Sequence, residues 1–126
     1  MGIVLIVDDE GPIVDVLTEL VHDAGHTAII ATNGHEALAL AHTYRPAIII
    51  SDLIMPLMDG YALVQALRAN PMLMDITVVL MSAGTRPAQL PPKTMFLLKP
   101  LNLDLITSLL QRLPQAHRYG TDPANG

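Results

Sequence analysis

Five side chains that can do chemistry lie at the ends of short apolar segments of this chain: Asp8, Asp9, Asp52, Ser82 and Lys99. Three carboxylates that lie close together repel one another, so they need a proton or a cation. Hard oxygen ligands suit Mg²⁺, which usually takes one or two carboxylates and keeps some of its water. A carboxylate can also attack a phosphoryl group, whose charge a metal ion and a lysine would neutralise. These residue types therefore predict the formation of an acyl phosphate.

The segments that carry these residues have the composition of buried strands. They are short, mostly apolar and largely rich in Ile and Val, and they span residues 3–7, 47–51, 76–81 and 95–98, with a weaker candidate at 27–31. Continuous apolar runs of this kind are typical of strands buried on both faces of a parallel sheet. Ligands bind such sheets in the crevice beyond the carboxyl ends of the strands. We therefore expect the five side chains to converge there, although they are far apart in the sequence.

Helical patterns alternate with these strands. Apolar spacing and helix-ending residues predict helices over about residues 12–24, 35–44, 61–70 and 103–113. Pro12 suits a first helical position, and Gly25 suits the position after a helix end. Strands that alternate with helices predict right-handed crossovers and an α/β fold, in which helices cover both faces of a parallel sheet.

The composition indicates one packed domain. The chain has 126 residues, of which 51% are hydrophobic, and we assign residues 1–113 to the domain and residues 114–126 to a disordered polar tail. Cysteine is absent, which excludes thiol chemistry and is compatible with a reducing compartment. A net charge of −5 argues against a nucleic-acid surface. No apolar stretch approaches the length of a membrane span, and none is flanked like a signal peptide.

Four blocks of sequence resemble a known family. They are Val7-Asp8-Asp9-Glu10, Ser51-Asp52 followed by Met-Pro-Leu-Met-Asp-Gly at 55–60, Met81-Ser82-Ala83, and Lys99-Pro100. In this order and at nearly these spacings they resemble the receiver domain of two-component response regulators, of the chemotaxis-regulator type. The resemblance covers about residues 2–113. It implies a flavodoxin-like, doubly wound sheet of five parallel strands in the order 2-1-3-4-5.

The resemblance also implies a role for each residue of the site. Asp52 would be the phosphoacceptor, Ser82 and Lys99 would bind the phosphoryl group, and Phe96 would be the switch aromatic. Mg²⁺ would be held by Asp9, Asp52 and the backbone carbonyl of Ile54, with Asp8 helping directly or through water. The Lys99–Pro100 peptide bond would be cis.

The family also implies partners and a location. The phosphoryl donor would be a sensor histidine kinase or a histidine phosphotransfer protein, and the output would pass to a downstream protein or to an attached output domain. The domain would be cytoplasmic, would bind no nucleic acid or membrane by itself, and could form a homodimer. It would not be an enzyme in its own right, apart from slow self-dephosphorylation at most.

The chain departs from the family pattern in two places. Only seventeen positions separate Ser82 from Lys99, and three prolines (Pro87, Pro91 and Pro92) lie between them, so we expect the fourth helix of the family to be shortened or absent. Near the site, Ile54 is apolar and Gly84 has no side chain. Neither can position a water molecule through a side-chain hydrogen bond, and this predicts slow self-dephosphorylation.

Three other functions use similar features. A phosphohydrolase of the haloacid dehalogenase type also forms an aspartyl phosphate, but it places Asp-x-Asp after its first strand and needs a cap domain. A flavodoxin-like flavin binder would need a phosphate-binding loop where Asp8, Asp9 and Glu10 stand. A receiver-like interaction module that is never phosphorylated remains the main alternative, and the short segment between Ser82 and Lys99 favours it slightly.

Overall fold

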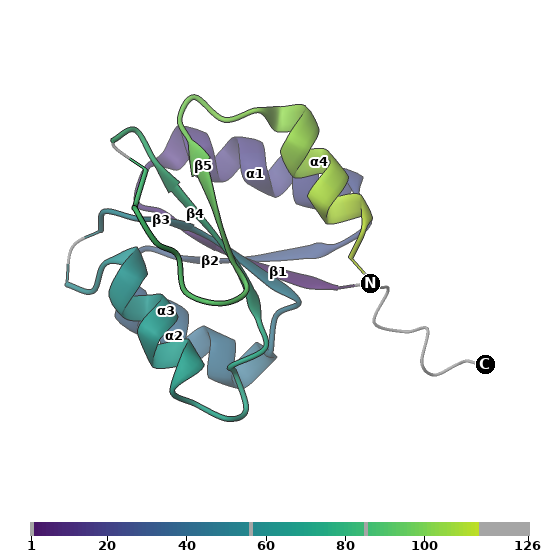
Figure 1. The fold of residues 1–126 in the computed structure, drawn as a ribbon. Coiled ribbons are helices and arrows are strands. Elements are labelled where there is room, and N and C mark those ends of the chain that lie inside the picture. Colours follow the sequence, from purple (N-terminus) through teal and green to yellow (C-terminus); the bar gives the residue numbers. More distant parts are fainter. Residues whose placement is uncertain (1, 56, 85, 114–126) are drawn as a thin grey trace.

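A computed structural model describes residues 2–55, 57–84 and 86–113 of the chain. Its centre is one parallel sheet in the order β2-β1-β3-β4-β5 (Figure 1). The strands are β1 (Ile3–Val7), β2 (Thr27–Ala31), β3 (Ile48–Asp52), β4 (Thr77–Ser82) and β5 (Thr94–Leu98). This is the strand order that the resemblance implied, and it confirms the predicted fold class.

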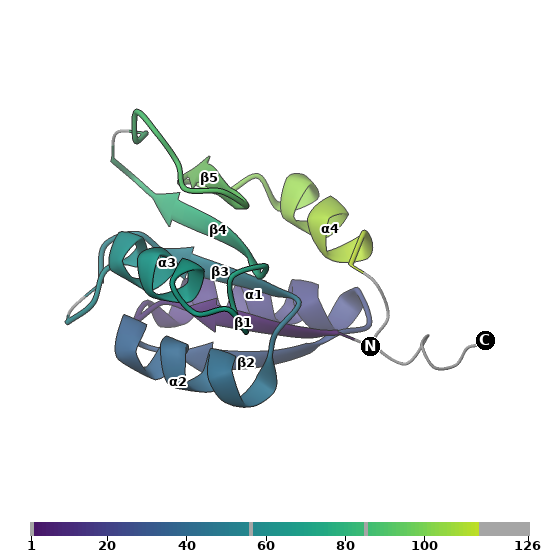
Figure 2. The same cartoon turned by 60° about the horizontal axis from the view of Figure 1, so that its bottom comes forward.

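Four helices in the described residues cover the two faces of the sheet. α1 (Gly11–Asp23) and α4 (Leu103–Gln111) lie on one face, and α2 (Gly34–Tyr44) and α3 (Gly60–Arg68) lie on the other (Figure 2). Alternate residues of each central strand enter opposite halves of the core: Leu5 packs with α2 and α3, whereas Ile6 packs with α1 and α4. Burial on both faces explains why these strands are apolar along most of their length.

Three of the helices begin at a side chain that caps them. The side-chain oxygens of Asn33, Asp59 and Asn102 accept hydrogen bonds from backbone N–H groups in the first turns of α2, α3 and α4, respectively. Such caps satisfy donors that have no partner within the helix. At the other end of α1, Gly25 has a φ of 85°, a backbone conformation that glycine adopts without strain. Its place after the helix end agrees with the sequence prediction.

No helix joins β4 to β5 within the described residues 83, 84 and 86–93. The prediction of a shortened or absent fourth helix is therefore confirmed for these residues, since the prolines cannot continue a helical hydrogen-bond pattern. The guanidinium of Arg68, at the end of α3, donates hydrogen bonds to the carbonyls of Pro92, Lys93 and Met74. Arg68 thereby satisfies backbone acceptors in the connections before and after β4, which contain no helix or strand at these residues.

Among the described residues, the helices are too short or too polar to traverse a bilayer. The predicted tail at 114–126 lies outside the described residues.

Candidate functional site

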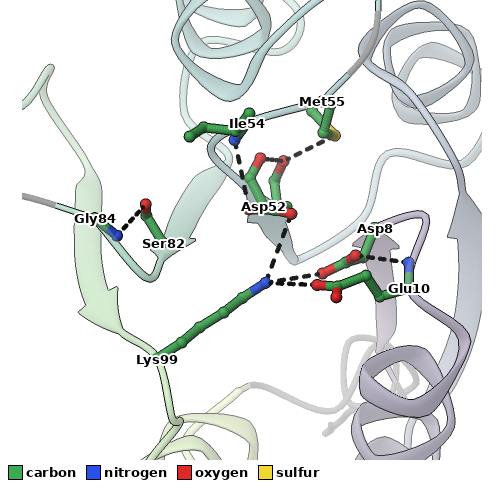
Figure 3. A network of polar contacts seen from close by, with 9 residues as sticks. Asp8, Glu10, Asp52, Ile54, Met55, Ser82, Gly84 and Lys99 are labelled. Atoms are coloured by element: carbon green, nitrogen blue, oxygen red, sulfur yellow. Dashed lines mark hydrogen bonds and ion pairs between the residues drawn. The ribbon is translucent and has the colours of Figure 1, made fainter.

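The carboxyl ends of the parallel strands bring the predicted site residues to one edge of the sheet (Figure 3). Asp8 follows β1, Asp52 ends β3, Ser82 ends β4 and Lys99 follows β5. A backbone hydrogen bond joins the ends of the last two strands: the N–H of Lys99 donates to the carbonyl of Ser82 at 2.9 Å. These four residues therefore converge at this edge, as predicted.

Lys99 lies among three carboxylates. Its Nζ is 3.1 Å from Glu10 Oε1, 3.6 Å from Asp52 Oδ2 and 3.7 Å from Asp8 Oδ2. The side chain is only 15% exposed, so its charge is poorly solvated. Although burial works against the ammonium, the pKa of Lys99 is raised, because the hydrogen bond that it donates to Glu10 and the charges of all three carboxylates outweigh burial.

Asp8 is buried, and one of its carboxylate oxygens has no hydrogen bond. Its Oδ1 accepts a hydrogen bond from the backbone N–H of Glu10 at 2.9 Å, whereas its Oδ2 has no hydrogen-bond partner. Burial raises the pKa of Asp8, and the nearby charge of Asp52 adds to the effect, while the Glu10 N–H and Lys99 oppose it. A buried carboxylate oxygen without a donor is unfavourable unless a cation or a proton satisfies it.

Asp52 is held at the start of a tight loop. The backbone N–H of Ile54 is 3.4 Å from Asp52 Oδ1, and the hydroxyl of Ser51 donates to the Asp52 carbonyl at 2.9 Å. The Ile54 side chain is 73% exposed and makes the rim of the site apolar on this side. The Asp52 carboxylate itself is almost fully buried, with one oxygen turned toward Lys99.

Ser82 and Phe96 lie along the β4–β5 side of the site. Ser82 is buried, and its Oγ accepts a hydrogen bond from the Gly84 N–H at 3.0 Å. Phe96 lies opposite Leu80 in the sheet and is 5% exposed. The guanidinium carbon of Arg86 lies 5.6 Å from the centre of its ring, within the range of a cation–π contact. The missing helix is thus partly replaced here by an arginine that covers the predicted switch aromatic. The Lys99–Pro100 bond is cis, as predicted.

The carboxylates suit a divalent cation, but they are not quite the predicted set. Oxygens of Asp8, Glu10 and Asp52 lie within 4.8 Å of one another. They form a hard, acidic group that suits Mg²⁺, and within it Asp8 Oδ2 has no hydrogen bond. Asp9 is exposed and lies outside this group, so its role in metal binding stays a prediction.

Sequence reasoning missed Glu10. The signal for it was the alternation of a strand, in which residues two apart share a side. Asp8 and Glu10 accordingly have oxygens in the carboxylate group, whereas Asp9 is exposed and lies outside it. The prediction that both adjacent aspartates reach the crevice is therefore confirmed for Asp8 and not for Asp9.

Asp8→Asn is expected to stabilise the metal-free protein at pH 7, by on the order of 1 kcal/mol. Because the pKa of Asp8 is raised in the fold, its contribution to stability falls as the pH rises from the ordinary Asp range through the folded value. Asparagine carries no charge and can still accept the Glu10 N–H. Urea unfolding with chelator would measure the gain, which should shrink as the pH is lowered toward 4.

Mg²⁺ provides the control for that experiment. The ion should stabilise the wild type more than the Asp8→Asn protein, since a ligand that binds only the folded state adds to its stability. A metal-free Asp8→Asn protein that is less stable than the wild type at pH 7 would mean that the ion pair with Lys99 outweighs burial of the charge.

This fold and this edge of charged residues are those of a signalling receiver domain, and comparison with known proteins agrees. The family model described as "Response regulator receiver domain" matches residues 4–111. The chain therefore belongs to the response regulator receiver domain family. This assignment separates it from the dehalogenase-type phosphohydrolases and from the flavin binders.

Individual relatives are similar over most of the domain. The receiver domain of a signal transduction histidine kinase from Syntrophus aciditrophicus has 31% sequence identity and a TM-score of 0.80, and the match covers 89% of each chain. A chemotaxis response regulator of Vibrio cholerae has 33% identity and a TM-score of 0.79, over 89% of this chain and 98% of that one. A chain named "Probable transcriptional regulator" from Porphyra purpurea is 33% identical over 114 residues, which are 86% of this chain. The chain spans about a third to about half of the length of the first such curated relatives.

Proposed function

We propose that this domain accepts a phosphoryl group on Asp52 from a phosphohistidine of a sensor histidine kinase or a histidine phosphotransfer protein. The observation that carries the proposal is the meeting of Asp52, Lys99 and an Asp8 oxygen without a hydrogen bond at one edge of the sheet. In the transfer, an oxygen of Asp52 forms the new bond to phosphorus while the bond from phosphorus to the histidine nitrogen breaks. The histidine leaves with the electron pair of that bond.

Each neighbouring residue has a proposed part in this step. Asp9, Asp52 and the Ile54 carbonyl, with help from Asp8, would hold Mg²⁺, which would supply positive charge against the phosphoryl oxygens. Lys99 neutralises further charge on the phosphoryl group, and the Ser82 hydroxyl donates a hydrogen bond to it. The hydroxyl hydrogen is available for this because Ser82 Oγ acts as the acceptor in its contact with Gly84.

The proposed output begins with Ser82 and Phe96. Movement of the Ser82 hydroxyl toward the phosphoryl group opens space beside Phe96 and shifts a pre-existing equilibrium between two surface shapes. Because Arg86 covers the Phe96 ring, such a shift would also change the segment between β4 and β5. A downstream protein or an attached output domain reads the change, and a homodimer is one further form of output. The curated relatives described as transcriptional regulators are longer than this chain, which is compatible with an attached output domain.

The alternative is an interaction module that is never phosphorylated, and one observation favours it. The helix that usually follows the fourth strand in this family is absent from the described part of the chain between Ser82 and Lys99. The buried Asp8 argues for the phosphoacceptor instead. Its charged form is unfavourable in the metal-free fold, and a module without metal or phosphoryl chemistry has no use for it.

The test is the intact mass of the protein after incubation with acetyl phosphate, with Mg²⁺ and with chelator. We expect a gain of one phosphoryl group that requires Mg²⁺. The failure of acetyl phosphate to label the protein, together with the failure of Mg²⁺ to bind in calorimetry, would favour the unphosphorylated module.

The phosphoryl group should be long-lived once formed. The exposed side chain of Ile54 offers no hydrogen bond to an attacking water, and neither does Gly84. Ile54→Asn is therefore expected to shorten the lifetime of the adduct several-fold, on the scale of one added polar contact to the reacting water. Loss of the adduct would be followed by mass spectrometry after removal of acetyl phosphate. A wild-type lifetime of seconds, or an unchanged lifetime in Ile54→Asn, would count against this explanation; Ile54→Val is the matched apolar control.

A further inference from the structure

Glu10 is the carboxylate that holds Lys99. Of the three acidic neighbours, only Glu10 is within hydrogen-bond distance of the Lys99 ammonium, at 3.1 Å, while Asp52 and Asp8 lie at 3.6 and 3.7 Å (Figure 3). Lys99 is therefore displaced from the phosphoacceptor toward a residue that the proposed function leaves without a role.

The side chain of Glu10 does not serve the helix that it precedes. Glu10 occupies the N-cap position of α1, where Ser, Thr, Asp or Asn would normally accept a hydrogen bond from the first turn, yet its side chain makes no such bond. Its backbone N–H donates to Asp8, which fixes the main chain beside the site. The side chain is 58% exposed and extends over the rim to Lys99. Its position is thus explained by Lys99 and not by helix capping.

A cation and Lys99 compete for the same carboxylates. A divalent ion bound to Asp8 and Asp52 would repel an ammonium held within 4 Å of both. Lys99 is too poorly exposed for water alone to replace a lost partner. Glu10 is the neighbour that lies toward solvent and outside the predicted ligand set, so it can keep the lysine while the ion occupies the other two.

We infer that Glu10 is a positioning residue, which accepts the Lys99 ammonium so that Mg²⁺ can occupy Asp8 and Asp52 while Lys99 stays at the edge of the site. This inference rests on the proposed function, because it assumes that Mg²⁺ binds there. With Glu10 removed, Lys99 pairs with Asp8 and Asp52 alone, and the ion must displace it without offering it another partner.

The test is a double-mutant cycle on Mg²⁺ binding, measured by isothermal titration calorimetry. The four proteins are the wild type, Glu10→Gln, Lys99→Met and the double variant. The loss of Mg²⁺ affinity caused by Glu10→Gln should be about fivefold larger when Lys99 is present than in the Lys99→Met background. Asp15→Asn removes one charge from an exposed position of α1 and should change the affinity by less than about twofold.

Two results would overturn the inference, and they are distinguishable. An equal or greater loss of affinity in the Lys99→Met background would show that Glu10 is a direct ligand of the ion or acts through its charge alone. In that case, labelling of the wild type by acetyl phosphate would leave the phosphoacceptor function standing. Absence of Mg²⁺ binding by the wild type would overturn the inference and the proposed function together.

Discussion

Asp52→Asn is expected to abolish the phosphoryl adduct completely while the protein stays folded. Asparagine has nearly the same shape as aspartate, and its side-chain oxygen can still accept the N–H of Ile54. The amide is neutral and its nitrogen electron pair is delocalised, so it is a far weaker nucleophile than a carboxylate, although the pocket is retained. Intact mass after incubation with acetyl phosphate and Mg²⁺ would measure the loss.

Asp59→Asn is the matched control for that substitution. Asp59 also lies in the loop after β3 and caps α3 by accepting the N–H of Ala62, and asparagine caps a helix as well as aspartate does. The Asp59→Asn protein should be labelled like the wild type. Persistence of an adduct in Asp52→Asn would instead mean that another group accepts phosphoryl, and the proposed assignment of Asp52 would be wrong.

Gly60→Ala should have the largest effect on stability among the substitutions near the site, a loss of roughly 1–3 kcal/mol in the free energy of unfolding. A Cβ on Gly60 would lie 2.9 Å from the Asp52 carbonyl oxygen, 2.9 Å from Leu80 Cδ2 and 3.0 Å from Leu53 Cα. Two of these three atoms belong to the backbone, so they cannot move aside by rotation of a side chain. The Gly60 N–H also donates to the Leu53 carbonyl at 2.7 Å, which holds the loop against the end of β3.

The same crowding should displace Asp52 and slow its phosphorylation. Urea unfolding and the initial rate of labelling by acetyl phosphate would measure the two effects of Gly60→Ala. Gly11→Ala is the matched control, because Gly11 also begins a helix and a Cβ there would meet nothing within 4 Å. That variant should be neutral or slightly more stable, since alanine loses less backbone entropy on folding. Equal stability of the two variants would contradict the packing explanation.

Much of the fold could be predicted because the strands are mostly apolar. Residues 3–7 and 47–51 contain hardly any polar side chain, which is compatible only with burial on both faces and hence with a parallel sheet covered by helices. The three prolines between Ser82 and Lys99 predicted the missing helix for an equally local reason, because each lacks a backbone donor. The contacts made in place of the helix could not be predicted, because they join distant segments: Arg68 comes from α3, and Arg86 lies over the ring of Phe96 on β5.

The sequence predicted which side chains would meet in the site better than it predicted which of them would bond to one another. Asp8, Asp52, Ser82 and Lys99 meet as expected because parallel strands end at a common edge. The carboxylate that accepts the hydrogen bond of Lys99 was not predicted: it belongs to Glu10, which lies 89 positions away in the sequence. The choice among three carboxylates depends on differences of half an ångström, and such differences follow from the path of the chain as it leaves β1.

The sequence by itself determined the class of fold and most of the residues able to do chemistry, because both depend on local composition and spacing. Only the tertiary structure decided that Asp8 is buried with one oxygen that lacks a hydrogen bond, that Asp9 lies outside the carboxylate group and that Glu10 binds Lys99. Burial and charge–charge distances are properties of segments brought together from distant parts of the chain. Local sequence patterns do not give burial or these distances, since each depends on where the other strands end.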